Sequence, residues 1–228
     1  MKHLLLITSL FFCRFSFAQF AIISDKDGFT NVRSDAKKEA KLVDSLINGH
    51  LIYILEKRGN WSVIEYLKRN KELNGFIYFD RHKLLSDYSV IPLKTRTDSS
   101  VKFVRDSIEI IVTQKPFQKN KHKFKYYREA PDQIELIDNE HYWGKDGGMP
   151  TTEYGSIRIK IGRKLIIVPK SAMRNFYQPN LDTIEINYDK EKNIFYIQSM
   201  NSDAAGSYMV AWKIEKGVYK DRLIAYGF

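Results

Sequence analysis

The sequence predicts a mainly β fold, with a small N-terminal barrel followed by an antiparallel β-rich (α+β) domain that carries one short helix. Short runs of β-branched and aromatic residues alternate with polar residues, which is the period of half-buried strands. Turn signals built from Gly, Asn and Asp separate these runs at close intervals. Hydrophobic residues make up 43% of the chain and aromatic residues 14%, which indicates packed domains rather than disorder.

Residues 1–18 have the pattern of a secretory signal peptide. Lys2 gives a positive start, residues 4–12 are apolar, and Ser16 and Ala18 are the small residues that precede a cleavage site. The apolar run is shorter than the roughly 20 residues that span a bilayer. We therefore expect cleavage after Ala18 and a periplasmic or secreted protein with no transmembrane segment in its mature chain.

Cys13 does not mark a lipoprotein, because Phe12 stands where a small residue is required and Arg14 follows. It is also the only cysteine, so the mature chain has no disulfide and its stability depends on core burial. Removal of two basic residues with the signal, from 37 Lys and Arg against 27 Asp and Glu, leaves a net charge of +8.

The positive charge leaves two interpretations open. Export disfavours nucleic acid as a partner, and the basic residues are scattered along the chain. The densest run, residues 118–128, alternates basic residues with aromatic or polar ones, as expected of a strand with one cationic face. That face is either simply solvated or a surface that binds anions, such as an anionic envelope surface.

Residues 19–86 form the predicted barrel. Five short strands between turns fit into this segment, and Asn48-Gly49 is a strong hairpin signal between two of them. An ordered series of motifs makes the segment specific: Asp27-Gly28, Asn31-Val32-Arg33-Ser34, Gly49, Gly59 with Trp61, and Gly75-Phe76-Ile77. This series resembles the bacterial SH3 (SH3b) domain, a small SH3-like barrel. The resemblance implies recognition of cell-wall peptide or another peptide, and no catalysis.

Aromatic residues of the predicted barrel are the first candidate ligand-binding positions. Trp61 follows a turn, where its side chain reaches the rim of the barrel, and Tyr78 points outward if Ile77 points into the core. Aromatic faces on small barrels stack on peptides or sugars, while the alternative is a packing role in the core. Tyr53 and Tyr66 would extend such a surface.

The remaining chain divides into a linker and a domain of unknown function. Residues 87–100 mix Ser, Asp, Thr and Pro and are predicted as the linker. Residues 101–228 carry many short strand patterns separated by turns, which predicts an antiparallel sheet. Residues 169–177 are the one segment with a helical pattern.

No catalytic residue, metal site or cofactor is predicted. The mature chain lacks the cysteine that a cysteine peptidase needs. Its histidines are far apart in sequence and form no metal-binding motif. We therefore expect a protein that is not an enzyme.

Two polar loops are the second set of candidate positions. Residues 138–150 include His141, Trp143 and Asp146, and residues 198–208 include Asp203. The loops are either turn-rich connections or one recognition surface. The leading hypothesis is an exported binding protein whose barrel recognises cell-wall peptide or an exported protein and whose second domain binds another partner. The alternatives are an immunity or inhibitor protein against a wall-degrading toxin, or a hydrolase that uses these loops.

Overall fold

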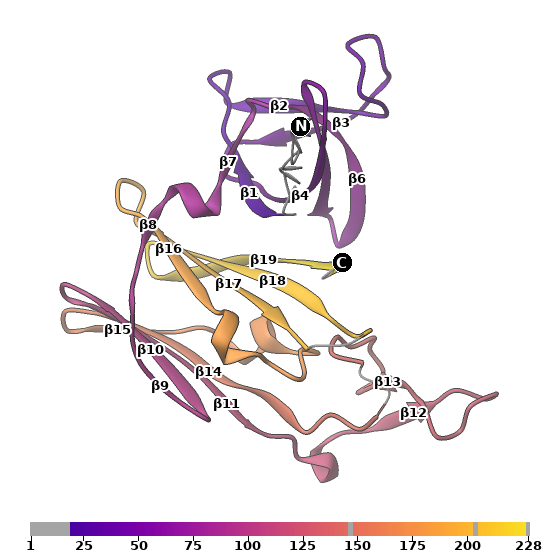
Figure 1. The fold of residues 1–228 in the computed structure, drawn as a ribbon, viewed down its shortest axis with the longest axis vertical. Helices are drawn as coiled ribbons and strands as arrows, with labels where there is room; N and C mark the ends of the chain where they lie inside the picture. Colours follow the sequence, from indigo (N-terminus) through magenta and orange to yellow (C-terminus); the bar gives the residue numbers. More distant parts are fainter. Residues whose placement is uncertain (1–18, 146–147, 203–204, 227–228) are drawn as a thin grey trace, which may run out of the picture.

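The fold is mainly β, as predicted, and its sheets are antiparallel. The computed structural model describes residues 19–145, 148–202 and 205–226. Figure 1 shows an N-terminal sheet that curls on itself above a sandwich of two further sheets. In the described part of the chain, no helix is long and apolar enough to cross a membrane.

The N-terminal curled sheet has seven strands in the order β3-β2-β6-β5-β4-β1-β7. Its alternating strands turn one set of side chains inward, where they form a core that includes Val32, Ile52, Ile64 and Ile77. Gly75 is required where β6 pairs with β2, because a Cβ there would lie 2.4 Å from Val32 Cγ1 and 2.9 Å from Arg33 O. The strands are β1 (Gln19–Ile23), β2 (Phe29–Arg33), β3 (Leu42–Ile47), β4 (Leu51–Arg58), β5 (Trp61–Lys68), β6 (Lys71–Tyr78) and β7 (His82–Leu84).

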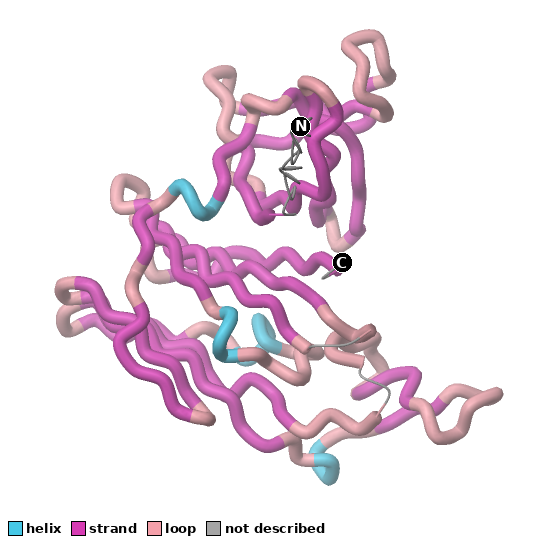
Figure 2. The backbone as a smooth tube through the Cα atoms, in the orientation of Figure 1, coloured by secondary structure: helices cyan, strands magenta, loops and turns pink. Residues whose placement is uncertain are grey.

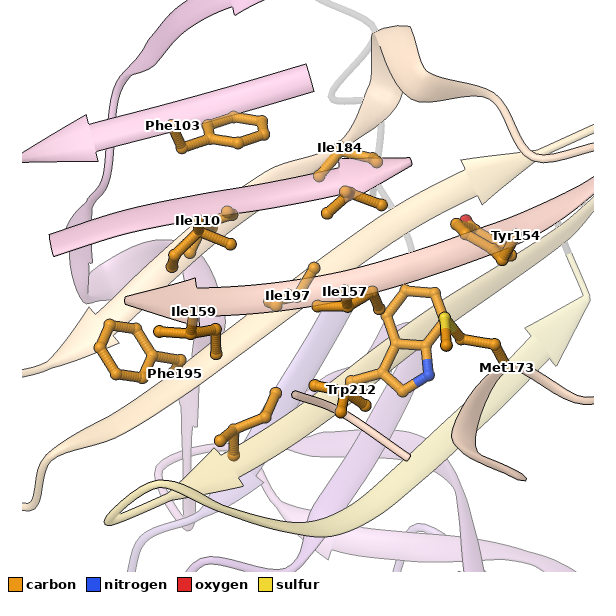
Figure 3. Close-up of a cluster of buried hydrophobic side chains, with 14 of the residues drawn as sticks. Phe103, Ile110, Tyr154, Ile157, Ile159, Met173, Ile184, Phe195, Ile197 and Trp212 are labelled. Atoms are coloured by element: carbon orange, nitrogen blue, oxygen red, sulfur yellow. The ribbon is translucent and has the colours of Figure 1, made fainter. Parts of the chain in front are cut away.

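The sandwich consists of two five-stranded sheets, in the orders β15-β14-β11-β10-β9 and β19-β18-β17-β16-β8. Large apolar side chains from both sheets fill the space between them, with Trp212 in their midst (Figure 3). A separate hairpin, β12 with β13, extends from one end. The strands are β8 (Ser89–Val90), β9 (Leu93–Thr97), β10 (Ser100–Arg105), β11 (Ile108–Pro116), β12 (Phe124–Tyr126), β13 (Ile134–Ile137), β14 (Thr152–Ile161), β15 (Lys164–Ile167), β16 (Glu185–Asp189), β17 (Ile194–Asn201), β18 (Tyr208–Glu215) and β19 (Val218–Tyr226).

The sheet that ends in β19 is covered on both faces. One face packs on the other sheet of the sandwich, and the opposite face packs on the curled sheet (Figure 1). In this second contact, Phe20 and Tyr53 from the curled sheet meet Tyr196 and Leu223 from the sandwich. Burial on both faces explains why β17 begins with four consecutive buried residues instead of alternating. The two parts of the molecule therefore share a continuous apolar contact.

The predicted linker, residues 87–100, belongs to the sandwich. Strand β8 pairs with β16, and β9 pairs with β10, so the segment contributes to both sheets. Ile91 between the two strands is fully buried. Every residue of β9 is exposed, and its polar composition therefore resembles that of a linker.

The short helix predicted within residues 169–177 is a single turn of 3-10 helix. It ends because side chains form hydrogen bonds to a carbonyl oxygen in this turn. Trp212 Nε1 donates to Ala172 O at 2.7 Å, and Arg222 Nη1 donates to the same oxygen at 2.9 Å. Asn175 then turns the backbone away with a φ of 69°. Figure 2 shows 3-10 turns lying between the two sheets of the sandwich. The 3-10 turns are η1 (Leu85–Asp87), η2 (Lys119–Lys121), η3 (Lys170–Met173) and η4 (Leu181–Thr183).

Candidate functional site

The structure brings Trp61 and Tyr78 together on the surface of the curled sheet. The two residues are direct cross-strand partners on β5 and β6. Their rings meet edge to face, with centroids 5.6 Å apart and planes at 88°, which is a favourable arrangement for an aromatic pair. Trp61 is half-buried and Tyr78 is 37% exposed. Tyr78 thus points outward beside the buried Ile77, as its sequence position predicts.

These two rings line a groove of about 450 Å³, which we call the aromatic groove. Phe29, which is 45% exposed, adds a third ring. Phe79 lies next to Tyr78, at 5.2 Å between ring centroids, and Lys57 Nζ lies 4.5 Å from the centre of its ring. The full lining is Asp25, Asp27, Phe29, Thr30, Asn31, Arg33, Lys38, Trp61, Tyr78 and Arg81.

Charged groups of both signs surround the aromatic groove, and one pair is held rigidly. Arg81 Nη1 donates to Asp25 Oδ1 at 2.7 Å, and the Asp25 side chain is only 3% exposed. Asn48 exchanges two hydrogen bonds with the Asp25 backbone, at 2.8 and 2.7 Å. In contrast, Lys38 and Asp27 are exposed. The groove thus combines an apolar floor with charged groups that can bind the polar backbone or ends of a peptide.

Tyr53 and Tyr66 lie outside the aromatic groove, and each is only 2% exposed. Tyr53 faces the sandwich, where its hydroxyl donates to Met209 Sδ at 3.0 Å. Tyr66 points into the curled sheet, and its hydroxyl donates to Asp44 Oδ2 at 3.1 Å. Burial and this hydrogen bond raise the pKa of Tyr66. Both tyrosines are packing residues in this structure.

The second set of predicted positions lies in loops of the sandwich, beside its contact with the curled sheet. His141 and Trp143 line a pocket of about 440 Å³, the loop pocket, together with Gly206 and Tyr226. The Trp143 and Tyr226 rings are 4.9 Å apart, and Tyr226 is 66% exposed. Asp146 and Asp203, also predicted here, lie outside the described residues.

Close backbone approaches bring the two predicted loops together. A Cβ on Gly206 would lie 2.3 Å from the backbone nitrogen of Lys145, so the loops touch at that glycine. Gly144 has a φ of 87°, and a Cβ there would lie 2.4 Å from Tyr177 O. Gly206 thus allows the two loops to approach each other, and Gly144 allows the first loop to approach Tyr177.

The loop pocket holds no acid–base pair between Glu140 and His141. Glu140 Oε1 accepts from Arg174 at 2.7 Å, and its other oxygen accepts from Asn175. His141 is exposed. Among the residues that the structure describes, no three His, Cys, Asp or Glu side chains are grouped so that they could hold a metal ion.

One cluster was not predicted from the sequence. His122 Nδ1 lies 2.7 Å from Asp138 Oδ2, its Nε2 lies 3.9 Å from Glu153 Oε2, and its ring stacks on Phe117. Burial alone would raise the pKa of Asp138, but hydrogen bonds from Lys123 N and His122 outweigh it and hold this pKa below its usual value. Phe117 and Glu153 are 36 positions apart in the sequence, and no local motif joins the residues of this cluster.

Comparison of the chain with protein-family models, curated proteins and solved structures found no match.

Proposed function

We propose that this chain is an exported, non-enzymatic binding protein whose N-terminal curled sheet recognises peptide, of the cell wall or of an exported protein, in the aromatic groove. Residues 1–18 support export, and the ordered SH3b-like motifs support a peptide-binding module. The second domain binds a further partner, and the loop pocket is its candidate surface.

The observation that carries the proposal is the partly exposed edge-to-face pair of Trp61 and Tyr78, with charged groups around it. Two rings held against each other lose little conformational freedom when a ligand binds, so contact with a peptide side chain is gained at low entropic cost. The paired Arg81 and the exposed Lys38 can bind carbonyl or carboxylate groups of the peptide, and Asp27 can accept from its amines.

The proposal is tested by replacing Tyr78 with alanine. We expect affinity for purified cell-wall fragments, or for a captured exported protein, to fall about thirtyfold, which corresponds to about 2 kcal/mol for an aromatic anchor. The melting temperature should change little, because the Tyr78 side chain is partly exposed. Trp61→Ala should weaken binding similarly and lower stability more.

Tyr127→Ala is the matched control, because Tyr127 is 39% exposed and lies near the hairpin β12–β13, outside the aromatic groove. Its binding should equal that of the unchanged chain. Equal affinities for Tyr78→Ala, Trp61→Ala and the unchanged chain would remove the aromatic groove as the ligand site.

A further inference from the structure

A third cleft opens at one end of the sandwich, between its two sheets. Its volume is about 720 Å³, within the range of small-molecule sites. We call it the polar cleft, because amide and carboxylate side chains dominate its lining. It shares no lining residue with the aromatic groove or the loop pocket. Its lining includes the polar side chains of Arg96, Asp98, Gln114, Gln178, Asn180 and Asp182.

Gln178 is held in one orientation by its side-chain oxygen. Gln178 Oε1 accepts from the backbone nitrogens of Thr151 and Thr152, each at 3.2 Å, and from their hydroxyls at 2.9 and 3.2 Å. The backbone is fixed too, because Ser202 N donates to Gln178 O at 3.0 Å. Gln178 Nε2 makes no hydrogen bond to another described residue. Its two N–H groups are therefore left for a ligand.

Gln114 and Asn180 likewise have one polar atom of the side-chain amide bonded within the protein and the other left for a ligand. Gln114 Nε2 donates to Asp98 O at 2.5 Å, which leaves Gln114 Oε1 as an acceptor. Asn180 Oδ1 accepts from Asp182 N at 3.0 Å, which leaves Asn180 Nδ2 as a donor. The cleft thus offers donors and acceptors together, each on a side chain whose other end is already fixed.

The wall of the polar cleft beside Asn180 is rigid. Asn201 is fully buried, and its Oδ1 accepts from the Tyr154 hydroxyl at 2.7 Å and from the Asn180 backbone at 3.0 Å. Pro179 and Leu181 line the cleft on either side of Asn180, and both are buried. The polar groups are therefore held in place beside a small apolar surface before any ligand binds.

The lining disfavours an anionic ligand. Arg96 is the one basic residue among the described residues that line the cleft, and its guanidinium is paired with Asp182 at 3.0 Å. Asp98 carries a carboxylate with no ion pair to any described residue, and it disfavours an anion. Neutral hydroxyl groups fit better, because each can donate to an oxygen and accept from an amide N–H at once.

We propose that the polar cleft binds a neutral saccharide. Sugar hydroxyls would accept from Gln178 Nε2 and Asn180 Nδ2 and donate to Gln114 Oε1 and the Asp98 carboxylate. This site is separate from the aromatic groove and does not rest on the function proposed for it.

The test uses Gln178→Glu, which keeps an oxygen for the four hydrogen bonds from Thr151 and Thr152 and replaces only the NH₂ group. The chain from Gln19 is first applied to a printed array of neutral and acidic oligosaccharides, and the best neutral oligosaccharide is then titrated by calorimetry. We expect Gln178→Glu to bind it at least tenfold more weakly, with an unchanged melting temperature. Asp98→Asn, which removes the carboxylate acceptor from an exposed residue, should also weaken it.

Gln133→Glu makes the same chemical change on an exposed turn and should leave binding unchanged. Tyr78→Ala should bind the saccharide normally, which separates this site from the aromatic groove. Retention of no neutral oligosaccharide on the array, or of acidic ones alone, would overturn the proposal. Equal saccharide affinity of Gln178→Glu, Asp98→Asn and the unchanged chain would overturn it as well.

Discussion

Lys213 in strand β18 donates a hydrogen bond from its ammonium group to the carbonyl oxygen of Gly49, at 2.9 Å. Gly49 lies in the turn between β3 and β4, so this bond ties the curled sheet to the sandwich. The Lys213 side chain is 14% exposed, so water screens the contact weakly. Together with the apolar contact around Phe20 and Leu223, it joins the two parts of the molecule.

Lys213→Met tests what the Lys213 ammonium, which also lies 3.7 Å from Glu215 Oε2, contributes to stability. Methionine keeps an apolar stem and removes the donor, so the loss should be about 1.5 kcal/mol of unfolding free energy, the scale of a hydrogen bond from a charged group. Urea unfolding measures it. Lys220→Met, at an exposed position of β19, should change the unfolding free energy by less than about 0.5 kcal/mol. Equal stabilities of both variants would mean that the bond to Gly49 contributes nothing.

Removal of two buried tyrosine hydroxyls, one at a time, should have different effects on the free energy of unfolding. The Tyr196 hydroxyl is fully buried and has no hydrogen-bond partner among the described residues. Tyr196→Phe should therefore leave the free energy of unfolding unchanged or raise it by about 1 kcal/mol. Tyr154→Phe removes the bond to Asn201 Oδ1 and should lower it by about 1–2 kcal/mol. Denaturant unfolding of the pair checks this, and a loss of equal size in both would contradict it.

Stability should fall as the solution becomes mildly acidic. Burial lowers the pKa of His50 and of His82 below the ordinary value of 6.5. The unfolded chain therefore binds protons at a pH where the folded chain does not, so stability is complete above about pH 6.5 and is lost below it. A His50→Gln, His82→Gln double variant should show a shallower decline of unfolding free energy between about pH 7.5 and pH 5.5.

One group of opposite sign is present in the double variant and in its control, so it does not affect the difference between them. Burial, with the nearby carboxylate of Glu72, raises the pKa of Glu65 above its ordinary value of 4.5. Ionisation of Glu65 therefore lowers the stability of the folded protein as pH rises. His141→Gln is the control, because His141 is exposed. A decline as steep in the double variant as in the control would exclude the two buried histidines as its source.

Alternation along a strand predicted that Tyr78 faces outward, whereas Tyr53, expected to extend the same surface, is buried for a physical reason. Ile77 fills the curled sheet, so its neighbour Tyr78 faces outward. Strand β4 has a second layer on its outer side, and Tyr53 is buried there against Met209. Period-2 patterns identify the two faces of a strand, but they do not reveal that another sheet covers the outer one.

Contacts between distant segments were the other part that the sequence did not reveal. Loops 138–150 and 198–208 were candidates for one surface, and the structure brings their described residues together. The polar cleft depends on Gln178, whose role becomes visible only when Thr151 and Thr152 lie beside it. Neither glutamine nor threonine carries a local motif that would have singled out these positions.

The meeting of the two loops at Gly206 gives a final prediction. Alanine at this position would place a Cβ 2.3 Å from the Lys145 backbone nitrogen, and backbone cannot yield as a flexible side chain does. Gly206→Ala should therefore push the loops apart and lower the free energy of unfolding by about 1–3 kcal/mol, the usual cost of overpacking. Because Trp143 lies in the same pocket, its fluorescence should shift as well. Gly148→Ala is the matched control, since no atom of the described residues lies within 4 Å of its added Cβ and its φ is not positive. That variant should be neutral or gain about 0.4–1 kcal/mol by restricting the unfolded chain. An unchanged Gly206→Ala protein, in both stability and fluorescence, would show that the loops do not meet at this glycine.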